Sequence, residues 1–488
     1  MAIALSCAPA PPPCPSVAPI VSSDKASSPG AASAAPAVAG ASHASPMAQA
    51  YGADVKRIIE AARKKPAAYE KLRELTDGVG HRLSGSKSLE LAVDWAKKRL
   101  EADGHQNVRA EKVMVPHWER GQESASIESP VKRPLAILGL GGTVGTKQGG
   151  ITGEVLVVRS YEELERAGAK VKDKIVLFDV QMRAHDEEKG SGYGDAVTFR
   201  ASGPSRAAKL GAKAVLVRSL ATASLSTPHT GATRFDDGVV KIPAAAIATE
   251  DAALLARLAE KGAVSVRLSL GAKQHKDAAS ANVVAELVGK EKPDEIVLIG
   301  AHLDSWDIGQ GAHDDGAGCV IMMQALTTLR TLGLVPRRTI RVVLFTNEEN
   351  GLAGAKAYAA DHAAEVSKHV LGIEADSGGF APWGFNVEVP KEHEGRATER
   401  VKAIADLLGP AFTLKVAAHG SGADLIPLVK AGVPGVGYVT QGAKYFDYHH
   451  SAADTLDKVD ANELADGVAV VAAFAYVVAD MPETILPR

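Results

Sequence analysis

Three successive apolar runs within residues 296–376 each end in acidic residues or a histidine. The run ends are His302-Leu-Asp304, Glu348-Glu349 and Glu374-Ala-Asp376. A glycine-rich loop after the first run ends in a further acidic pair, Asp314-Asp315. Ligands of open α/β sheets bind at the carboxyl ends of the strands. The pattern therefore predicts a metal site at one edge of a sheet, and the choice of residues indicates that it is catalytic.

Strand-like and helix-like segments alternate over about 200 residues toward the C-terminus, which predicts an α/β fold with a mixed, largely parallel sheet flanked by helices. The expected strands lie at residues 280–289, 296–304, 339–349, 368–379, 412–420 and 432–440. Helical periodicity at 50–64, 67–76 and 87–103 predicts three helices ahead of the sheet. Asp460 followed by Glu463 is a capping-box pattern that predicts the start of a last helix.

Residues 128–275 show a different pattern, in which short apolar runs are separated by turns and short helices. We expect a β-rich insertion there, inside a main domain made of residues 47–127 and 276–488. The polar loop 227–231 of the insertion can face the site, although a surface loop is the simpler interpretation. Residues 1–46 are rich in Ala, Pro and Ser, a composition typical of a disordered tail.

The bulk composition excludes several classes of function. A net charge of -3 and an aromatic content of 5% argue against nucleic-acid binding. No run of 18 apolar residues is present, so we expect no transmembrane segment. Ala4-Leu5-Ser6-Cys7 is similar to the end of a bacterial lipoprotein signal, which favours export and lipid anchoring through Cys7. The basic and apolar regions of such a signal are missing or too short here, so a coincidence of composition is the alternative interpretation.

The residues at the run ends suit two metal ions that share one carboxylate. His302 and Asp376 can bind the first metal, and Asp314 can bridge. Glu349 can bind the second metal together with His449 or His450. Asp304, two residues after His302, suits an orienting role for the imidazole through its other nitrogen. Glu348 can take a proton from water and pass it to a leaving amine.

The chain resembles the co-catalytic di-zinc exopeptidases, within them the carboxypeptidase Q group, from about residue 50 to the C-terminus. The passages that carry the resemblance are AHLDSWDIGQGAHDDG, SLSTPHTG, DGVVKIPAAAI, AGVPGV and VVADMPE. It implies peptide hydrolysis (EC 3.4) by a metal-bridging hydroxide, with Glu348 as general base and Asp304 as orienting residue. It implies two Zn²⁺ ions per chain, held by His302, Asp314, Glu349, Asp376 and His450.

The same resemblance implies four further features. The peptide bond Asp314–Asp315 should be cis, the insertion should be a protease-associated domain that shapes the cleft, and homodimers are expected. Tyr448 and His449 are candidates for contacting the substrate or the oxyanion, although a pocket-wall ring is the simpler interpretation of Tyr448.

Two other functions fit the same fold. One is a receptor or scaffold without catalysis, and the other is a transferase similar to glutaminyl cyclase with a single zinc. The sequence leaves open whether free N-termini or free C-termini are cleaved, and which residues and peptide lengths are preferred.

Overall fold

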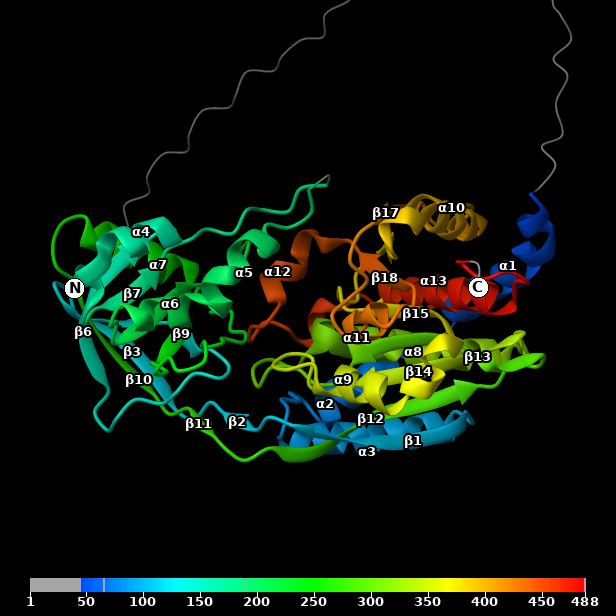
Figure 1. The fold of residues 1–488 in the computed structure, drawn as a ribbon, viewed down its shortest axis with the longest axis horizontal. Helices are drawn as coiled ribbons and strands as arrows, with labels where there is room; N and C mark the ends of the chain where they lie inside the picture. Colours follow the sequence, from blue (N-terminus) through cyan, green and yellow to red (C-terminus); the bar gives the residue numbers. More distant parts are fainter. Residues whose placement is uncertain (1–44, 65, 188, 487–488) are drawn as a thin grey trace, which may run out of the picture. The chain divides into compact units, whose positions relative to one another are not determined.

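The computed structural model describes residues 45–64, 66–187 and 189–486. The expected Ala/Pro/Ser tail, with Cys7, lies almost entirely outside these residues. The predicted α/β class is confirmed, because two eight-stranded mixed sheets are present and helices pack on them (Figure 1).

The first sheet contains the strands predicted in the C-terminal half of the chain. In spatial order its strands are β1 (Gln106–Val115), β12 (Ala278–Leu287), β14 (Arg338–Phe345), β13 (Lys292–His302), β15 (His369–Ala375), β18 (Gly435–Thr440), β16 (Pro382–Glu388) and β17 (Lys415–Ala418). The four central strands β14, β13, β15 and β18 are parallel, whereas β1, β12 and β16 pair antiparallel with their neighbours toward the centre. The predicted mixture of directions is therefore correct.

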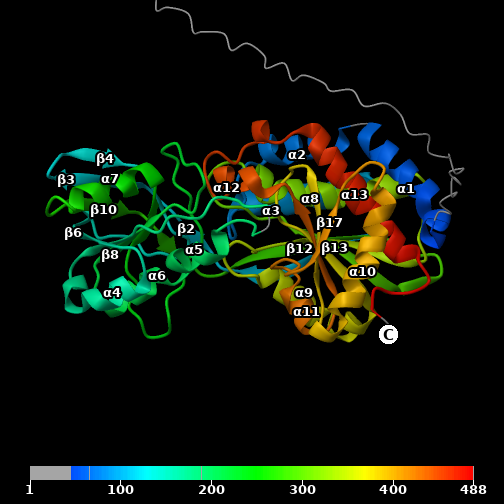
Figure 2. The ribbon, with the colours of Figure 1, turned by 90° about the horizontal axis from the view of Figure 1, so that it is seen from above.

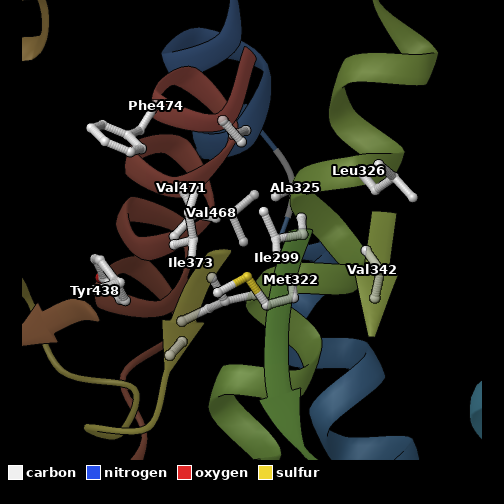
Figure 3. Packing of buried hydrophobic residues seen from close by; sticks show 14 of the residues in the cluster. Ile299, Met322, Ala325, Leu326, Val342, Ile373, Tyr438, Val468, Val471 and Phe474 are labelled. Carbon is white, nitrogen blue, oxygen red and sulfur yellow. The ribbon is translucent and has the colours of Figure 1, made fainter. Parts of the chain in front are cut away.

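Helices cover both faces of the first sheet, as Figure 2 shows. One face carries α1 (Pro46–Lys64), α2 (Ala67–Gly78), α3 (Lys87–Ala102), α8 (Ala317–Thr331), α10 (Glu394–Ala405) and α13 (Ala461–Asp480). The other carries α9 (Ala353–Asp361) and α11 (Ile426–Lys430). Successive strand residues belong to opposite cores: Ile299 and Val342 pack under α8 and α13 (Figure 3), whereas Leu298 packs under α11.

Helix α13 bears on the expectation that no transmembrane segment is present. An 18-residue window of this 20-residue helix has a mean hydropathy of 1.5, so by length and composition the helix could cross a membrane. However, 78% of the window is buried inside the fold, where α13 packs against α1 and α8. It is a core helix. Asp460 caps it as predicted, accepting hydrogen bonds from the backbone N–H groups of Asn462 and Glu463.

The second sheet lies in the insertion and has its own apolar cores. In spatial order its strands are β4 (Arg133–Leu135), β3 (Glu123–Ser129), β10 (Ser265–Leu270), β6 (Ile151–Val158), β7 (Ile175–Phe178), β8 (Ala214–Arg218), β9 (Ala244–Ile247) and β5 (Ile137–Gly139). Its helices are α4 (Tyr161–Ala167), α5 (Tyr193–Ala201), α6 (Gly203–Lys209) and α7 (Thr249–Ala259). Strand β3 begins at Glu123, ahead of the expected start of the insertion at residue 128. Its polar-rich sequence contains no continuous apolar run, and for this reason the sequence pattern did not indicate the strand.

The chain passes between the two sheets through a two-stranded ribbon of β2 (Trp118–Glu119) and β11 (Lys273–Gln274). A short helix, α12 (Tyr445–Tyr448), precedes His449 and His450. Single-turn segments complete the described chain at Gly168–Val171, Ala312–Gly316, Ala363–Lys368, Lys391–His393, Asp406–Leu408, Gly442–Lys444 and Leu456–Lys458.

Candidate metal centre

Three neighbouring parallel strands bring the predicted residues to one edge of the first sheet. His302 is the last residue of β13, Glu348 and Glu349 follow β14, and Asp376 follows β15. Because β14, β13 and β15 are adjacent and parallel, their carboxyl ends meet. This is the arrangement that the spacing of the apolar runs predicts.

The first group of side chains consists of His302, Asp314 and Asp376. Nε2 of His302 lies 3.2 Å from Oδ1 of Asp314 and 3.6 Å from Oδ1 of Asp376. The three ligand atoms lie within 4.8 Å of one another. His302 and Asp314 are buried, and a quarter of the Asp376 side chain is exposed, so the group opens toward Asp376.

The second group shares Asp314 with the first. Nε2 of His450 lies 3.1 Å from Oδ2 of Asp314 and 2.9 Å from Oε2 of Glu349. His449 stacks on His450, and its Nε2 lies farther away, 3.7 Å from Oδ2 of Asp314. Both histidines are thus within reach, and the geometry favours His450. Asp314 uses one oxygen toward each group, as a bridging carboxylate would.

The buried polar atoms of the cluster fit a cation. Nε2 of His302, Oδ2 of Asp314 and Oε1 of Glu349 are buried without a hydrogen-bond partner. A cavity of about 10 Å³ adjoins Asp314, Glu349 and His450, which suits an ion and is too small for a peptide. Nitrogen and carboxylate oxygen donors are those that zinc prefers at hydrolytic sites.

Protonation of the metal-free cluster supports the same conclusion. Burial raises the pKa of Glu349 to about 7, and the carboxylate of Asp314 acts in the same direction. Burial lowers the pKa of His450, but the carboxylates of Glu349 and Asp314 outweigh it and hold that pKa well above its usual value. Without metal ions, protons bound to Glu349 and His450 thus offset the negative charge of the buried carboxylates. Metal binding would displace them.

The loop that carries Asp314 is held by two further carboxylates. Asp454 accepts hydrogen bonds from the backbone N–H groups of His313 at 2.7 Å and of Asp314 at 3.1 Å. Asp315 accepts from the backbone N–H groups of His302 and Gly318, both at 3.1 Å, and so caps the start of α8. The peptide bond Asp314–Asp315 is cis, as the resemblance implies. The sequence did not point to Asp454, whose only signal is its place four residues after His450.

Asp304 is buried beside the cluster, but its contacts differ in part from the expected ones. Nδ1 of His302 lies 3.0 Å from the backbone carbonyl oxygen of Asp304 and 3.7 Å from its carboxylate oxygen Oδ1. The carboxylate itself accepts hydrogen bonds from the backbone N–H groups of Glu348 at 3.0 Å and Glu349 at 3.3 Å. Asp304 therefore contacts the imidazole and also holds the turn after β14.

Loop and helix residues of the insertion support His450 from outside the cluster. Nδ1 of His450 lies 3.3 Å from the carbonyl oxygen of Thr230, and the Thr230 N–H donates to the carbonyl of His450 at 2.9 Å. Arg200 donates to the same Thr230 carbonyl at 3.1 Å. His229 lies 2.6 Å from the carbonyl of His449 through its Nδ1. The expectation that loop 227–231 is a surface loop was wrong for His229 and Thr230, which are buried against His449 and His450.

Comparison with known proteins agrees with this geometry. The model of peptidase family M28 matches residues 282–475. Carboxypeptidase Q of Mus musculus is 45% identical over 422 residues, covering 86% of this chain and 87% of that protein. Carboxypeptidase Q of Homo sapiens is 42% identical, covering 89% and 90%. The chain belongs to peptidase family M28. It is a zinc metallopeptidase (EC 3.4), and within that class a metallo-exopeptidase that acts on peptides.

Solved structures share the fold of this M28 peptidase. A peptidase M28 precursor from Shewanella amazonensis is 38% identical with a TM-score of 0.85, covering 89% of this chain and 98% of that one. A zinc aminopeptidase from Bacillus subtilis is 21% identical with a TM-score of 0.63, covering 85% and 94%. This second likeness concerns the fold alone.

At Asp376, the cluster of metal-ligand side chains opens onto a cavity of about 660 Å³, a volume typical of small-ligand sites. Its walls come from the first sheet, with Asp376, Trp383 and Lys415, and from the insertion, with His185 and Tyr193. The size of this cavity suits a short peptide beside the cluster.

Two tyrosines near His449 occupy different positions. Tyr448 stacks on His313 at 5.6 Å between ring centroids and lies beside Phe380. Tyr445 lines the cavity, and burial raises its pKa well above the usual value, with the carboxylates of Asp314 and Asp376 acting in the same direction. Sequence reasoning passed over Tyr445, which nothing in the local pattern distinguishes from Tyr448.

Proposed function

We propose that this M28 peptidase is a di-zinc exopeptidase that cleaves dipeptides or short peptides. The observation that carries the proposal is the sharing of Asp314 between two groups of ligand atoms. One oxygen faces His302 and the other faces His450. A shared carboxylate of this kind suits two metals better than one.

The residues divide between the two ions. His302, Asp314 and Asp376 would hold one zinc, whereas Asp314, Glu349 and His450 would hold the other. When bound, two zinc ions lower the pKa of a water molecule toward neutrality and polarise the scissile carbonyl. Asp304, Asp454 and the Thr230 carbonyl keep the side chains or main chain of these ligands in place.

Glu348 is the proposed general base. Its backbone is fixed by the hydrogen bond to Asp304, and its side chain is half-buried at the cluster. Burial raises the pKa of Glu348 well above its usual value, and the carboxylates of Asp376 and Glu349 act in the same direction, against His302. Metal charge at the cluster opposes this rise. The carboxylate can then accept a proton from water and donate it to the leaving amine.

The insertion is proposed to be a protease-associated domain with two tasks. His185 and Tyr193 form one wall of the cavity, so the insertion limits the size of the peptide that can enter. Thr230 and Arg200 orient His450. The first task concerns the substrate and the second concerns the metal.

Native mass spectrometry of the purified enzyme tests the metal count, with at least two zinc ions per chain expected. One zinc would favour a cyclase-like transferase, and none would favour a scaffold. The same spectrum reports whether the chain forms a homodimer. A dipeptide panel with free, N-blocked and C-blocked ends then measures direction. Lack of cleavage of every free dipeptide by the two-zinc enzyme would contradict the proposal.

We also propose export, from the run Ala4-Leu5-Ser6-Cys7. Expression in a bacterial host with radiolabelled palmitate should label the wild-type chain and leave Cys7→Ser unlabelled. Equal labelling of both chains, or of neither, would contradict lipid anchoring through Cys7.

A further inference from the structure

A second group of ligand-type side chains lies on the ribbon that joins the two sheets. It consists of His117, Glu119 and His275, and their ligand atoms lie within 4.8 Å of one another. Nε2 of His275 lies 3.0 Å from one oxygen of Glu119, and Nε2 of His117 lies 3.7 Å from the other. None of these three residues takes part in the metal centre described above.

The backbone of the ribbon holds the two imidazoles together. Strands β2 and β11 pair antiparallel, and the N–H of His275 donates to the carbonyl of His117 at 2.9 Å. The rings stack with 4.5 Å between centroids and 26° between planes, so both Nε2 atoms face Glu119. His117 is further confined because its side chain packs against Gly85, where a Cβ would lie 2.7 Å from it.

We propose that His117, Glu119 and His275 bind a third divalent transition-metal ion, zinc foremost. Two imidazoles and one carboxylate are a ligand set that zinc accepts, with water in the fourth position. Side-chain exposures of 25% for His117, 57% for Glu119 and 38% for His275 give the ion access from solvent. The exposed carboxylate can rotate to close the remaining distance.

Such an ion would cross-link the two passages of the chain between the sheets. One passage runs from β1 through β2 to β3, and the other from β10 through β11 to β12. The ion would bind the folded ribbon and not the unfolded chain, and would thus stabilise the fold by mass action. The proposal does not depend on how many zinc ions the catalytic cluster holds.

The test compares zinc content at equal free zinc after equilibrium dialysis of the full-length enzyme. We expect His117→Ala/His275→Ala to hold one zinc per chain fewer than wild type, whatever the catalytic count. Glu119→Gln should weaken binding of this extra zinc by about ten-fold while leaving the fold intact. The matched control is His81→Ala/His393→Ala, which should keep the wild-type content. Equal zinc content in wild type and both ribbon variants would mean a Glu–His ion pair only, and would overturn the proposal.

A second readout covers the case in which the double variant folds poorly. Crystals soaked in zinc should show an anomalous peak between His117, Glu119 and His275. Added zinc should also raise the midpoint of thermal unfolding of wild type more than that of Glu119→Gln. A soaked crystal of wild type without a peak at the ribbon would contradict the proposal.

Discussion

The two eight-stranded sheets place similar residues at similar positions with different results. Each has four contiguous parallel strands at its centre. In the second sheet, Asp179 follows β7 and is paired with Arg218 at the end of β8, at 2.9 Å. In the first sheet, Glu349 and Asp376 follow β14 and β15 and face histidines and other acids. An acid at a strand end thus indicates a metal site only where no arginine neutralises it.

The two regions also have different tasks. The first sheet and its loops supply all five proposed ligands and the base. The insertion that contains the second sheet contributes Thr230 and Arg200. The Thr230 carbonyl faces His450, and Arg200 donates a hydrogen bond to that carbonyl. Changes in the first region should therefore reduce the rate or metal affinity strongly, and changes in the second should do so weakly.

Glu348→Gln should give the largest effect. The amide keeps the shape of the side chain but cannot accept a proton, so we expect kcat to fall by about 10²-fold or more. Zinc content should be unchanged, which separates a base from a ligand. Steady-state kinetics on a cleaved dipeptide and metal analysis measure the two quantities. Glu392→Gln, at an exposed position, is the control; near wild-type kcat in Glu348→Gln would refute the assigned role.

Asp454→Asn should give the next largest effect. The carboxylate accepts one N–H with each oxygen, and an amide can accept only one, so the loop of Asp314 loses a hydrogen bond. We expect zinc affinity to fall by about 10- to 100-fold, as for other residues that orient ligands. Competition with a chelator measures it. Asp457→Asn, at an exposed site three residues on, should leave affinity unchanged. Equal affinities of both variants would remove Asp454 from the support of the site.

Buried His369, at the start of β15, should make the first sheet sensitive to acid. Burial lowers its pKa to about 4, from the usual 6.5. The unfolded chain therefore binds the proton first, and stability present above pH 6.5 is lost as the pH falls toward 4. The loss is about 1.4 kcal/mol per pH unit in that window.

His369→Gln should shrink the difference in free energy of unfolding between pH 6.5 and pH 5.5 by about 1 kcal/mol. Urea denaturation of the zinc-free protein measures this difference. His81→Gln, at an exposed position, should retain the full wild-type pH dependence. A His369→Gln curve parallel to wild type would show that other groups cause the acid sensitivity.

How much of this the sequence could predict depends on distance along the chain. His302, Glu349 and Asp376 were predictable because each lies at or shortly after the end of a buried strand, and parallel strands bring their ends together. His450 required the resemblance, since His449 and His450 lie next to each other and both reach the cluster. Thr230 and His450 are 220 residues apart, one in a loop of the insertion and the other after α12 of the main domain, so no local pattern marks their contact.

Arg200→Lys should give the smallest effect and sharpen the comparison most. The guanidinium donates to the Thr230 carbonyl at 3.1 Å and to the hydroxyl of Tyr193 at 2.6 Å, and a lysine can keep only part of this fork. The Thr230 carbonyl would still face His450, so we expect zinc affinity to fall about three-fold, below the full effect of an orienting residue. Arg206→Lys, whose guanidinium lies over the ring of Tyr161, is the control in the same region. A loss as large as that of Asp454→Asn would mean that the second sheet builds the metal site as much as the first does, and the division between the two regions would fail.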